Sequence, residues 1–132
     1  MKKVLSLFLA VVMILSLTAC VQEPAGEKGD TYKAALLLNG TLGDKSFFDS
    51  ANDGLEKLRD ELGKDVFDFK VEQMGATATD EPKWAPTLLD FCETGEYDVI
   101  IIGTYQMIEG LADAATQFPE QKFIFFDETF DF

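Results

Sequence analysis

Four short apolar segments alternate with longer amphipathic segments along the chain. Residues 34–38, 99–102 and 123–126 are continuously apolar, and each run stops at Asn, Gly or Asp. Such runs are typical of strands that are covered on both faces of a parallel sheet. Residues 66–71 instead alternate between apolar and charged side chains, so we expect this further strand nearer an edge of the sheet.

The segment after the first predicted strand has the pattern of a helix with one apolar side. Apolar residues recur there every three or four positions, and charged residues lie between them. Ser46 is the expected N-cap, Asp49 stands three positions later as in a capping box, and Gly63 follows the last apolar residue. The apolar residues are Phe47, Ala51, Leu55, Leu58 and Leu62.

Two shorter helices are predicted further along the chain. The second helix ends at Gly95 and has Pro86 in its first turn, where proline is tolerated. Cys92 lies on the apolar side of this helix, so we expect a small buried side chain there. The third helix covers residues 107–118 and is stopped by Pro119.

The predicted order of elements is β-α-β-α-β-α-β, which indicates an α/β fold with a parallel, doubly wound sheet. In open sheets of this kind, ligands bind beyond the carboxyl ends of the strands. The loops at those ends, 39–46, 75–83, 103–105 and 127–129, combine small residues, hydroxyls and carboxylates with few cations. Because carboxylates accept hydrogen bonds from hydroxyl groups, a neutral polyol suits these loops better than a phosphate or an acid.

Composition narrows the possible chemistry further. The 132 residues include 24 acidic and 11 basic side chains, for a formal net charge of −13. Such a surface repels phosphate backbones, so no nucleic acid partner is expected. The chain contains no histidine, which excludes Ser-His and Cys-His nucleophile pairs, an imidazole base and His-ligated zinc. Arg59 is the only arginine, so an arginine cluster for an anion is also excluded. These exclusions favour binding over catalysis, and no cofactor is expected.

Residues 1–19 have the features of a lipoprotein signal peptide. Two lysines precede the apolar run 4–17, which is too short to span a bilayer comfortably. The sequence Leu-Thr-Ala-Cys at 17–20 resembles the bacterial lipobox, in which the cysteine becomes the first residue and carries the lipid. We therefore expect Cys20 to anchor the protein at the extracytoplasmic face of a bacterial cell membrane, and residues 20–31 to form a flexible tether. An ordinary secretory signal with a chance cysteine is the alternative.

Three further segments resemble one family of lipoproteins. They are residues 43–55 (GDKSFFDSANDGL), 97–105 (YDVIIIGTY) and 118–127 (FPEQKFIFFD), in the family's order. The family is the basic membrane protein family, which comprises substrate-binding components of ABC transporters and includes the purine-nucleoside-binding PnrA type. The resemblance implies a type I periplasmic-binding fold, in which two α/β lobes close on a small ligand and an ABC permease is the partner.

The resemblance also implies where a nucleoside-like ligand would bind. Asp44 and Asp127 would contact its sugar hydroxyls, whereas Ser46 and Phe47 would shape the cleft. Gly103 and Thr104, in the turn after the third strand, would let the backbone approach the ligand. Asn52, in the first helix, stands where many members carry an aromatic residue. The candidate ligand-binding residues are Asp44, Ser46, Phe47, Asn52, Gly103, Thr104 and Asp127.

Simpler interpretations of these residues stay open. Asp44 also suits the start of a helix, where the helix dipole favours an acid, and Phe47 also begins the apolar side of that helix. Asp127, Glu128 and Asp131 could together hold a hard cation. The spacing of an EF-hand is missing, however, so a solvated acidic strand end is the simpler interpretation.

Length is the main departure from the family. Members have a second lobe, whereas residues 32–132 would form most of the first lobe and stop after its fourth strand. We therefore expect an incomplete lobe and favour a fragment of a longer protein. Two other functions stay open. One is a surface module that binds a protein through its acidic face, and the other is a flavodoxin-like enzyme that uses a metal with Asp44 or Asp127.

Overall fold

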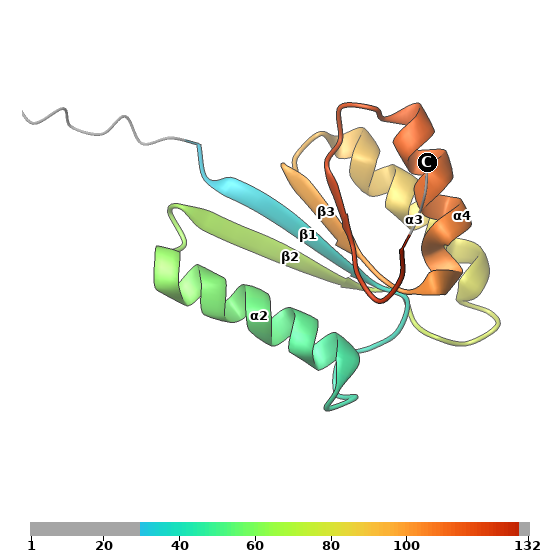
Figure 1. Cartoon of the computed structure of the whole chain (residues 1–132), viewed down its shortest axis with the longest axis horizontal. Coiled ribbons are helices and arrows are strands. Elements are labelled where there is room, and N and C mark those ends of the chain that lie inside the picture. Colours follow the sequence, from blue (N-terminus) through green and yellow to red (C-terminus); the bar gives the residue numbers. More distant parts are fainter. Residues whose placement is uncertain (1–29, 130–132) are drawn as a thin grey trace, which may run out of the picture.

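The strands form one parallel sheet in the spatial order β2-β1-β3-β4 (Figure 1). The computed structural model describes residues 30–129, so the predicted signal peptide, Cys20 and most of the predicted tether lie outside the described residues. The strands are β1 (Tyr32–Leu38), β2 (Phe67–Gln73), β3 (Val99–Ile102) and β4 (Phe123–Phe125). The predicted parallel sheet is confirmed, and so is the position of the alternating strand, since β2 lies at an edge and pairs with β1.

Helices cover both faces of the sheet. Helix α2 lies on one face, while α3 and α4 lie side by side on the other (Figure 1). This arrangement is the doubly wound α/β fold that the order of elements predicts. The helices are α2 (Phe47–Leu62), α3 (Glu81–Thr94) and α4 (Ile108–Gln117), and the 3-10 turn η1 (Tyr105–Met107) precedes α4. Among residues 30–129, each helix is too short or too polar to span a membrane.

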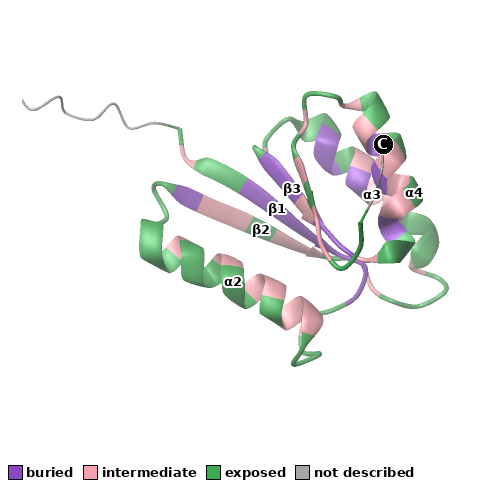
Figure 2. Ribbon diagram, in the orientation of Figure 1, coloured by how far each residue is buried: buried purple, intermediate pink, exposed green. Residues whose placement is uncertain are grey.

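The two faces of the sheet are buried to different extents. Successive residues of a strand point to opposite faces, so Ala35 and Leu37 of β1 pack toward α3 and α4, whereas Ala34 packs toward α2. The cluster on the α3 and α4 side contains twelve buried residues, and the cluster on the α2 side contains three. Most of the buried helical surface in Figure 2 accordingly lies on α3 and α4.

Helix α2 has the predicted apolar side but buries none of its residues. Leu58 and Leu62 remain 38% and 49% exposed at the end of the helix, and α2 appears entirely green and pink in Figure 2. The helix lies mainly against the edge strand β2. An edge strand offers a narrower apolar surface than the middle of a sheet, so the apolar side of α2 is covered only in part.

Helix α3 corrects one expectation. It begins at Glu81, so Pro86 lies inside the helix and not in its first turn. Pro82 occupies the start of the helix, where its missing N–H group is not needed. The buried indole of Trp84 donates a hydrogen bond of 2.9 Å to the carbonyl oxygen of Gly75 and so holds the early turns against the preceding loop. This tertiary contact is not visible in the periodicity of the sequence.

Candidate functional site

The carboxyl ends of β1, β3 and β4 align three polar residues. Leu37 pairs with Ile102, and Ile102 pairs with Phe125. Two residues beyond these pairs, the chain reaches Asn39, Thr104 and Asp127. Because the strands are parallel, all three residues leave the sheet at the same edge, which is where ligands bind in open α/β sheets.

Asn39, Thr104 and Gln106 form a hydrogen-bonded series at this edge. Asn39 is 5% exposed, and its Nδ2 donates to the Thr104 hydroxyl at 3.0 Å. The Thr104 hydroxyl in turn donates to Oε1 of Gln106. The other end of the Asn39 amide, Oδ1, is buried without a hydrogen-bond partner among the described residues. Thr104 is one of the sequence-predicted site residues, whereas Asn39 and Gln106 are not.

Two glycines at the same edge each lie directly beneath an aromatic ring. A Cβ atom at Gly103 would approach the Phe126 ring to 2.8 Å, and one at Gly40 would approach the Phe48 ring to 2.2 Å. Phe47 lies against both rings, with centroid separations of 5.1 Å to Phe126 and 5.6 Å to Phe48. Both distances are within the normal range for aromatic pairs. The three phenylalanines therefore form one aromatic cluster over the ends of β1 and β3.

An open apolar groove of about 580 Å³ lies beside this cluster, between α2 and the outer part of the sheet. Its polar side chains are the hydroxyls of Ser46 and Ser50, and its walls are otherwise apolar or glycine. The lining residues are Ser46, Phe47, Ser50, Ala51, Gly54, Leu55, Ile101, Ile124 and Phe126. Two of the sequence-predicted site residues, Ser46 and Phe47, thus lie at one surface suited to a flat apolar ring. Asn52 is on α2 but is not part of that lining.

Asp44 holds the start of α2. Its carboxylate accepts hydrogen bonds from the backbone N–H groups of Ser46 at 3.0 Å, Phe48 at 3.0 Å and Asp49 at 3.2 Å. These bonds, the one from Phe48 first, hold the pKa of Asp44 below its ordinary value, because they stabilise the charged form. Three acceptor positions of the carboxylate are therefore occupied by the protein itself.

The predicted capping role of Ser46 is wrong in its detail. Ser46 is the residue before the helix, but its side chain makes no capping hydrogen bond. The Asp49 carboxylate instead accepts from the N–H groups of Gly43 at 2.7 Å and Lys45 at 2.8 Å, both before Ser46. Two carboxylates therefore bind the loop and the first turn together, which leaves the Ser46 hydroxyl beside the groove.

Asp127 is exposed immediately after β4, and its backbone has a φ of +76°. A non-glycine residue with positive φ is uncommon, and here it turns the chain away as soon as β4 ends. Lys45 has a φ of +53° in the loop after β1. Both residues with this unusual backbone thus lie in loops at the carboxyl edge of the sheet.

The loop between β2 and α3 is also internally bonded. The Asp80 carboxylate accepts from the Thr77 hydroxyl at 2.6 Å and from Lys83 Nζ at 3.1 Å. These two partners, Thr77 first, lower the pKa of Asp80. The carboxylate also fills the space beside Gly75, where a Cβ atom would approach it to 2.4 Å. Lys83 is therefore held by an acid at this edge and is not a free cation for a ligand.

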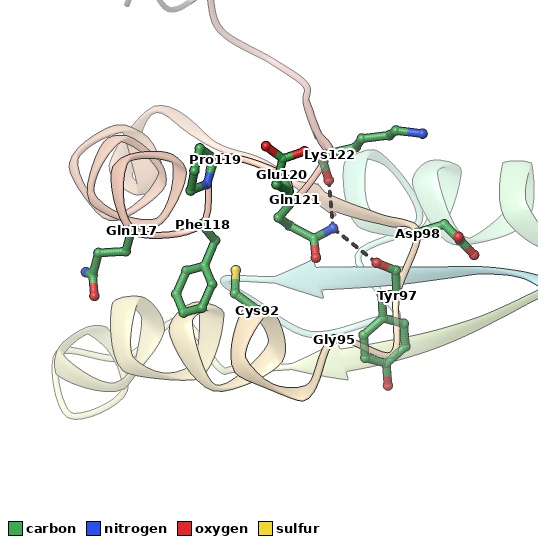
Figure 3. A pocket seen from close by; sticks show the side chains of 10 residues that line it. All are labelled: Cys92, Gly95, Tyr97, Asp98, Gln117, Phe118, Pro119, Glu120, Gln121 and Lys122. Carbon is green, nitrogen blue, oxygen red and sulfur yellow. Dashed lines mark hydrogen bonds between the residues drawn. The ribbon is translucent and has the colours of Figure 1, made fainter.

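A second cavity, of about 550 Å³, lies at the opposite end of the sheet (Figure 3). Asp98 and Lys122, which line it, come just before β3 and β4. The Gln121 amide crosses between these strands and donates to the carbonyl oxygens of Tyr97 at 3.2 Å and Lys122 at 3.1 Å. Because this cavity is at the amino ends of the strands, it is separate from the candidate site.

Cys92 is buried, as expected, and burial raises the pKa of its thiol to about 11. A thiol with such a pKa is a poor nucleophile near neutral pH, because the thiolate is the reactive form. Within residues 30–129, no group of three His, Cys, Asp or Glu side chains is placed to hold a metal ion. Asp131, which belongs to the acidic group considered for a cation, lies outside the described residues.

The fold is shared with solute-binding proteins of ABC transporters. A solute-binding protein from Aeropyrum pernix K1 superposes with a TM-score of 0.62 at 29% identity, over 74% of this chain and 25% of that chain. Another, from Conexibacter woesei, shares the fold with a TM-score of 0.56 at 22% identity, over 70% of this chain and 28% of that one. The family described as "ABC transporter substrate-binding protein PnrA-like" matches residues 31–131. The chain belongs to this family, so the expected resemblance is confirmed.

Relatives with similar sequences are longer and are named as lipoproteins. An uncharacterised lipoprotein of Pyrococcus horikoshii is 31% identical over 98% of this chain and 32% of its own length. One from Pyrococcus furiosus is 31% identical over 98% of this chain and 31% of its own length. The chain thus spans about a third of the length of these relatives. Both relatives are archaeal, whereas the lipobox pattern suggested a bacterial membrane, so the kind of cell stays a prediction.

Some of the sequence-predicted residues meet at this edge of the sheet, and their role toward a ligand stays a prediction. The candidates that the structure brings into contact with neighbouring strands are Phe47, Gly103 and Thr104. The residues that the sequence analysis missed are Asn39, Gly40, Phe48, Gln106 and Phe126. One signal could have found Asn39, because it is a polar residue placed directly after a fully buried central strand. The paired contacts of each phenylalanine with a distant glycine have no such signal in the sequence.

Proposed function

We propose that this chain forms a ligand-binding lobe of a lipid-anchored, extracytoplasmic solute-binding component of an ABC importer. Its ligand is a nucleoside or a similar neutral polyol, which is bound by closure of a cleft and handed to the permease without covalent chemistry. The family match over residues 31–131 is the observation that carries this proposal. It also disfavours the flavodoxin-like enzyme, since the family and its structural relatives are solute-binding proteins.

The chemistry of the site supports a ligand with hydroxyl groups and a flat ring. Asp127 offers an exposed carboxylate at the end of β4, which accepts hydrogen bonds from hydroxyls. Asp44 offers a second carboxylate in the loop after β1, although it already accepts three backbone hydrogen bonds. Phe47 and the groove next to it offer an apolar surface of the kind that a base would cover. Gly103, which lies beneath the Phe126 ring, and Asn52, which lies on α2, belong to the proposed site through the family resemblance.

The anchor and the permease complete the proposal. Cys20 carries the lipid after removal of residues 1–19, and residues 20–31 tether the lobe to the membrane. The relatives' names as lipoproteins support this part. Residues 32–132 supply one lobe in this proposal, and a second lobe would complete the enclosure of the ligand, as pockets normally bury most of a small ligand.

Titration calorimetry tests the proposal, with adenosine added to the protein in its complete, two-lobed form. We expect saturable binding of adenosine and at least about tenfold weaker binding of adenosine 5′-monophosphate, because the acidic edge repels phosphate. Asp127→Ala should lower the affinity for adenosine about 10- to 100-fold, which is typical for a lost hydrogen bond to a charged group. Asp113→Ala, which removes an exposed carboxylate of α4, is the matched control and should bind like the wild type.

Two results would contradict the proposal at different levels. A folded wild-type chain that binds no nucleoside in its complete, two-lobed form would overturn the proposed function. Equal adenosine affinity in wild type and Asp127→Ala would leave the function standing and overturn the assignment of Asp127. Circular dichroism spectra of each variant show whether the sheet and helices are intact.

A further inference from the structure

The Thr104 hydroxyl is held in one orientation by two neighbours. It receives a hydrogen bond from Asn39 Nδ2 at 3.0 Å and donates its own proton to Gln106 Oε1. A hydroxyl has one proton and two acceptor lone pairs. Since the proton and one lone pair are used, the remaining capacity of Thr104 Oγ1 is that of an acceptor.

Asn39 has the burial needed to impose this orientation. It is 5% exposed, follows the central strand β1, and lies opposite Thr104 in the continued register of β1 and β3. Its Oδ1 is a buried acceptor without a partner among the described residues. Buried polar groups in folded proteins are nearly always hydrogen-bonded. Asn39 Oδ1 is enclosed by the protein, so the group of this pair that is left for a ligand is the remaining lone pair of Thr104 Oγ1, and no hydroxyl proton is unused.

We propose that Asn39 and Gln106 are positioning residues that make Thr104 an acceptor toward the ligand, so that this point of the site selects a hydrogen-bond donor. The group taken there is a ligand hydroxyl or amine, and a carbonyl, carboxylate or phosphate oxygen is rejected. This inference rests on the proposed function, because it assumes that the ligand lies at the carboxyl edge. It goes further by naming the polarity that the site demands at one atom.

A second acceptor leaves the sheet at the same edge. Asp127 stands two residues beyond β4 at the matching position and carries a carboxylate, another acceptor. Gln106 is exposed on η1, and its Oε1 is occupied by the Thr104 proton. A ligand oxygen without a proton would therefore meet the remaining lone pair of Thr104 Oγ1, and this contact is repulsive.

Two substitutions of Gln106 test the orientation of the Thr104 hydroxyl. Because Gln106 is exposed, neither substitution should disturb folding. Gln106→Glu keeps an acceptor for the Thr104 proton, whereas Gln106→Leu removes it and frees the hydroxyl to turn. The probes are adenosine and its 2′-fluoro and 3′-fluoro deoxy analogues, in which fluorine replaces a hydroxyl and presents only lone pairs. Gln117→Leu, at another exposed glutamine on α4, is the control.

We expect the wild type to bind one fluoro analogue at least about tenfold more weakly than adenosine. That ratio should persist in Gln106→Glu and in the control, and it should shrink severalfold in Gln106→Leu. The same ratio in Gln106→Leu as in the wild type would overturn the inference. So would a wild type that binds adenosine and both fluoro analogues equally.

A second measurement needs no ligand and separates this inference from the proposed function. Thermal unfolding midpoints are compared for Asn39→Ala, Thr104→Val and the double variant of the full chain. We expect the double variant to lose clearly less than the two single shifts combined, because the two residues share one hydrogen bond. Asn39→Asp removes the donor to Thr104, so its thermal midpoint should also lie below that of the wild type.

Additive shifts of the midpoint, or an Asn39→Asp variant with the wild-type midpoint, would overturn the inference whether or not a nucleoside binds. Absence of adenosine binding together with clear coupling would contradict the proposed function alone.

Discussion

The carboxylate of Asp44 holds the first turn of α2 by accepting hydrogen bonds from three backbone N–H groups. The N–H groups at the start of a helix lack partners within the helix, so an acceptor placed there satisfies them and also interacts favourably with the helix dipole. The same contacts leave Asp44 little freedom to move toward a ligand. At the residue scale, its structural role is observed and its ligand role stays a proposal.

The hydrogen bonds to Asp44 should make part of the stability depend on acid pH. The pKa of Asp44 lies below its ordinary value in the folded chain, so on acidification the unfolded chain takes up this proton first. The stabilisation is therefore complete above the ordinary pKa and is lost as the pH falls through the folded value. We expect Asp44→Asn to lower the thermal midpoint at about pH 6, and we expect this effect to shrink as the pH falls below the ordinary pKa of the carboxyl group and through the lowered one.

Asp53→Asn is the matched control for this prediction, because Asp53 is an exposed carboxylate on the same helix. Its effect on the midpoint should be smaller than that of Asp44→Asn at neutral pH. A constant difference between wild type and Asp44→Asn across the whole pH range would show that the carboxylate charge is not what stabilises the turn.

At the scale of elements, the helices differ in how much of the core they build. Helix α3 contributes four buried residues, including Trp84 and Leu88, whereas α2 contributes none. Both helices have an amphipathic pattern, so the difference arises from where each lies on the sheet. Helix α3 packs with α4 over the central strands, and α2 lies against β2 at the edge.

The same substitution on each helix should measure this difference. Leu88→Ala removes a side chain that is fully buried and should lower the free energy of unfolding by about 2–5 kcal/mol. Leu62→Ala removes a side chain that is 49% exposed and should cost less than about 1 kcal/mol. Urea denaturation of both variants tests this. Similar losses would mean that α2 is covered more completely than the described residues show.

Helix α2 also contains a glycine that can be replaced with a gain. A Cβ atom at Gly54 would have nothing within 4 Å, and alanine is favoured over glycine inside a helix by about 1 kcal/mol. We therefore expect Gly54→Ala to raise the free energy of unfolding by about 0.5–1 kcal/mol.

Gly110→Ala in α4 is the contrasting variant. The new Cβ atom would lie 3.1 Å from Cβ of Ala85 in α3, so the two helices would have to separate slightly. The gain in helix propensity should be reduced or reversed there. Urea denaturation measures the free energy of unfolding of both variants. An equal increase in Gly54→Ala and Gly110→Ala would contradict the close contact of α3 and α4 at this point.

At the scale of the whole molecule, the large core between the sheet and the α3–α4 pair should set the cooperativity of unfolding. Cys92 reports on this core, since it is 5% exposed and belongs to the buried cluster. Burial raises the pKa of its thiol to about 11, so two effects, low access and little thiolate, slow its reaction with a thiol reagent.

In a chain that carries Cys20→Ser, we expect the Ellman reagent to label Cys92 at about pH 8 at least about 100-fold more slowly in buffer than in denaturant. Leu88→Ala should accelerate labelling in buffer, because it destabilises the same core, whereas Leu62→Ala should change the rate much less. Rapid labelling of the native chain would show that the end of α3 opens without unfolding of the rest.

The sequence by itself determined the fold class and the order of elements. Apolar runs such as 34–38 and 99–102 are long enough to be buried on both faces, and this property depends only on neighbouring residues. The role of Cys92 as a buried side chain followed in the same way from its place on one side of a helix. Local periodicity therefore carried this information.

Only the tertiary structure decided which side chains meet at the site. Asn39 and Thr104 are 65 residues apart in the chain, and they meet because β1 and β3 are neighbours in the sheet. Phe126 and Phe48 lie over Gly103 and Gly40 for the same kind of reason. The sequence favoured Ser46 as the N-cap, but its side chain makes no capping hydrogen bond, and the loop conformation brings the Asp44 carboxylate to the first N–H groups of α2 instead. Contacts of this kind depend on strand order and loop conformation, which a pattern of apolar and polar residues does not encode.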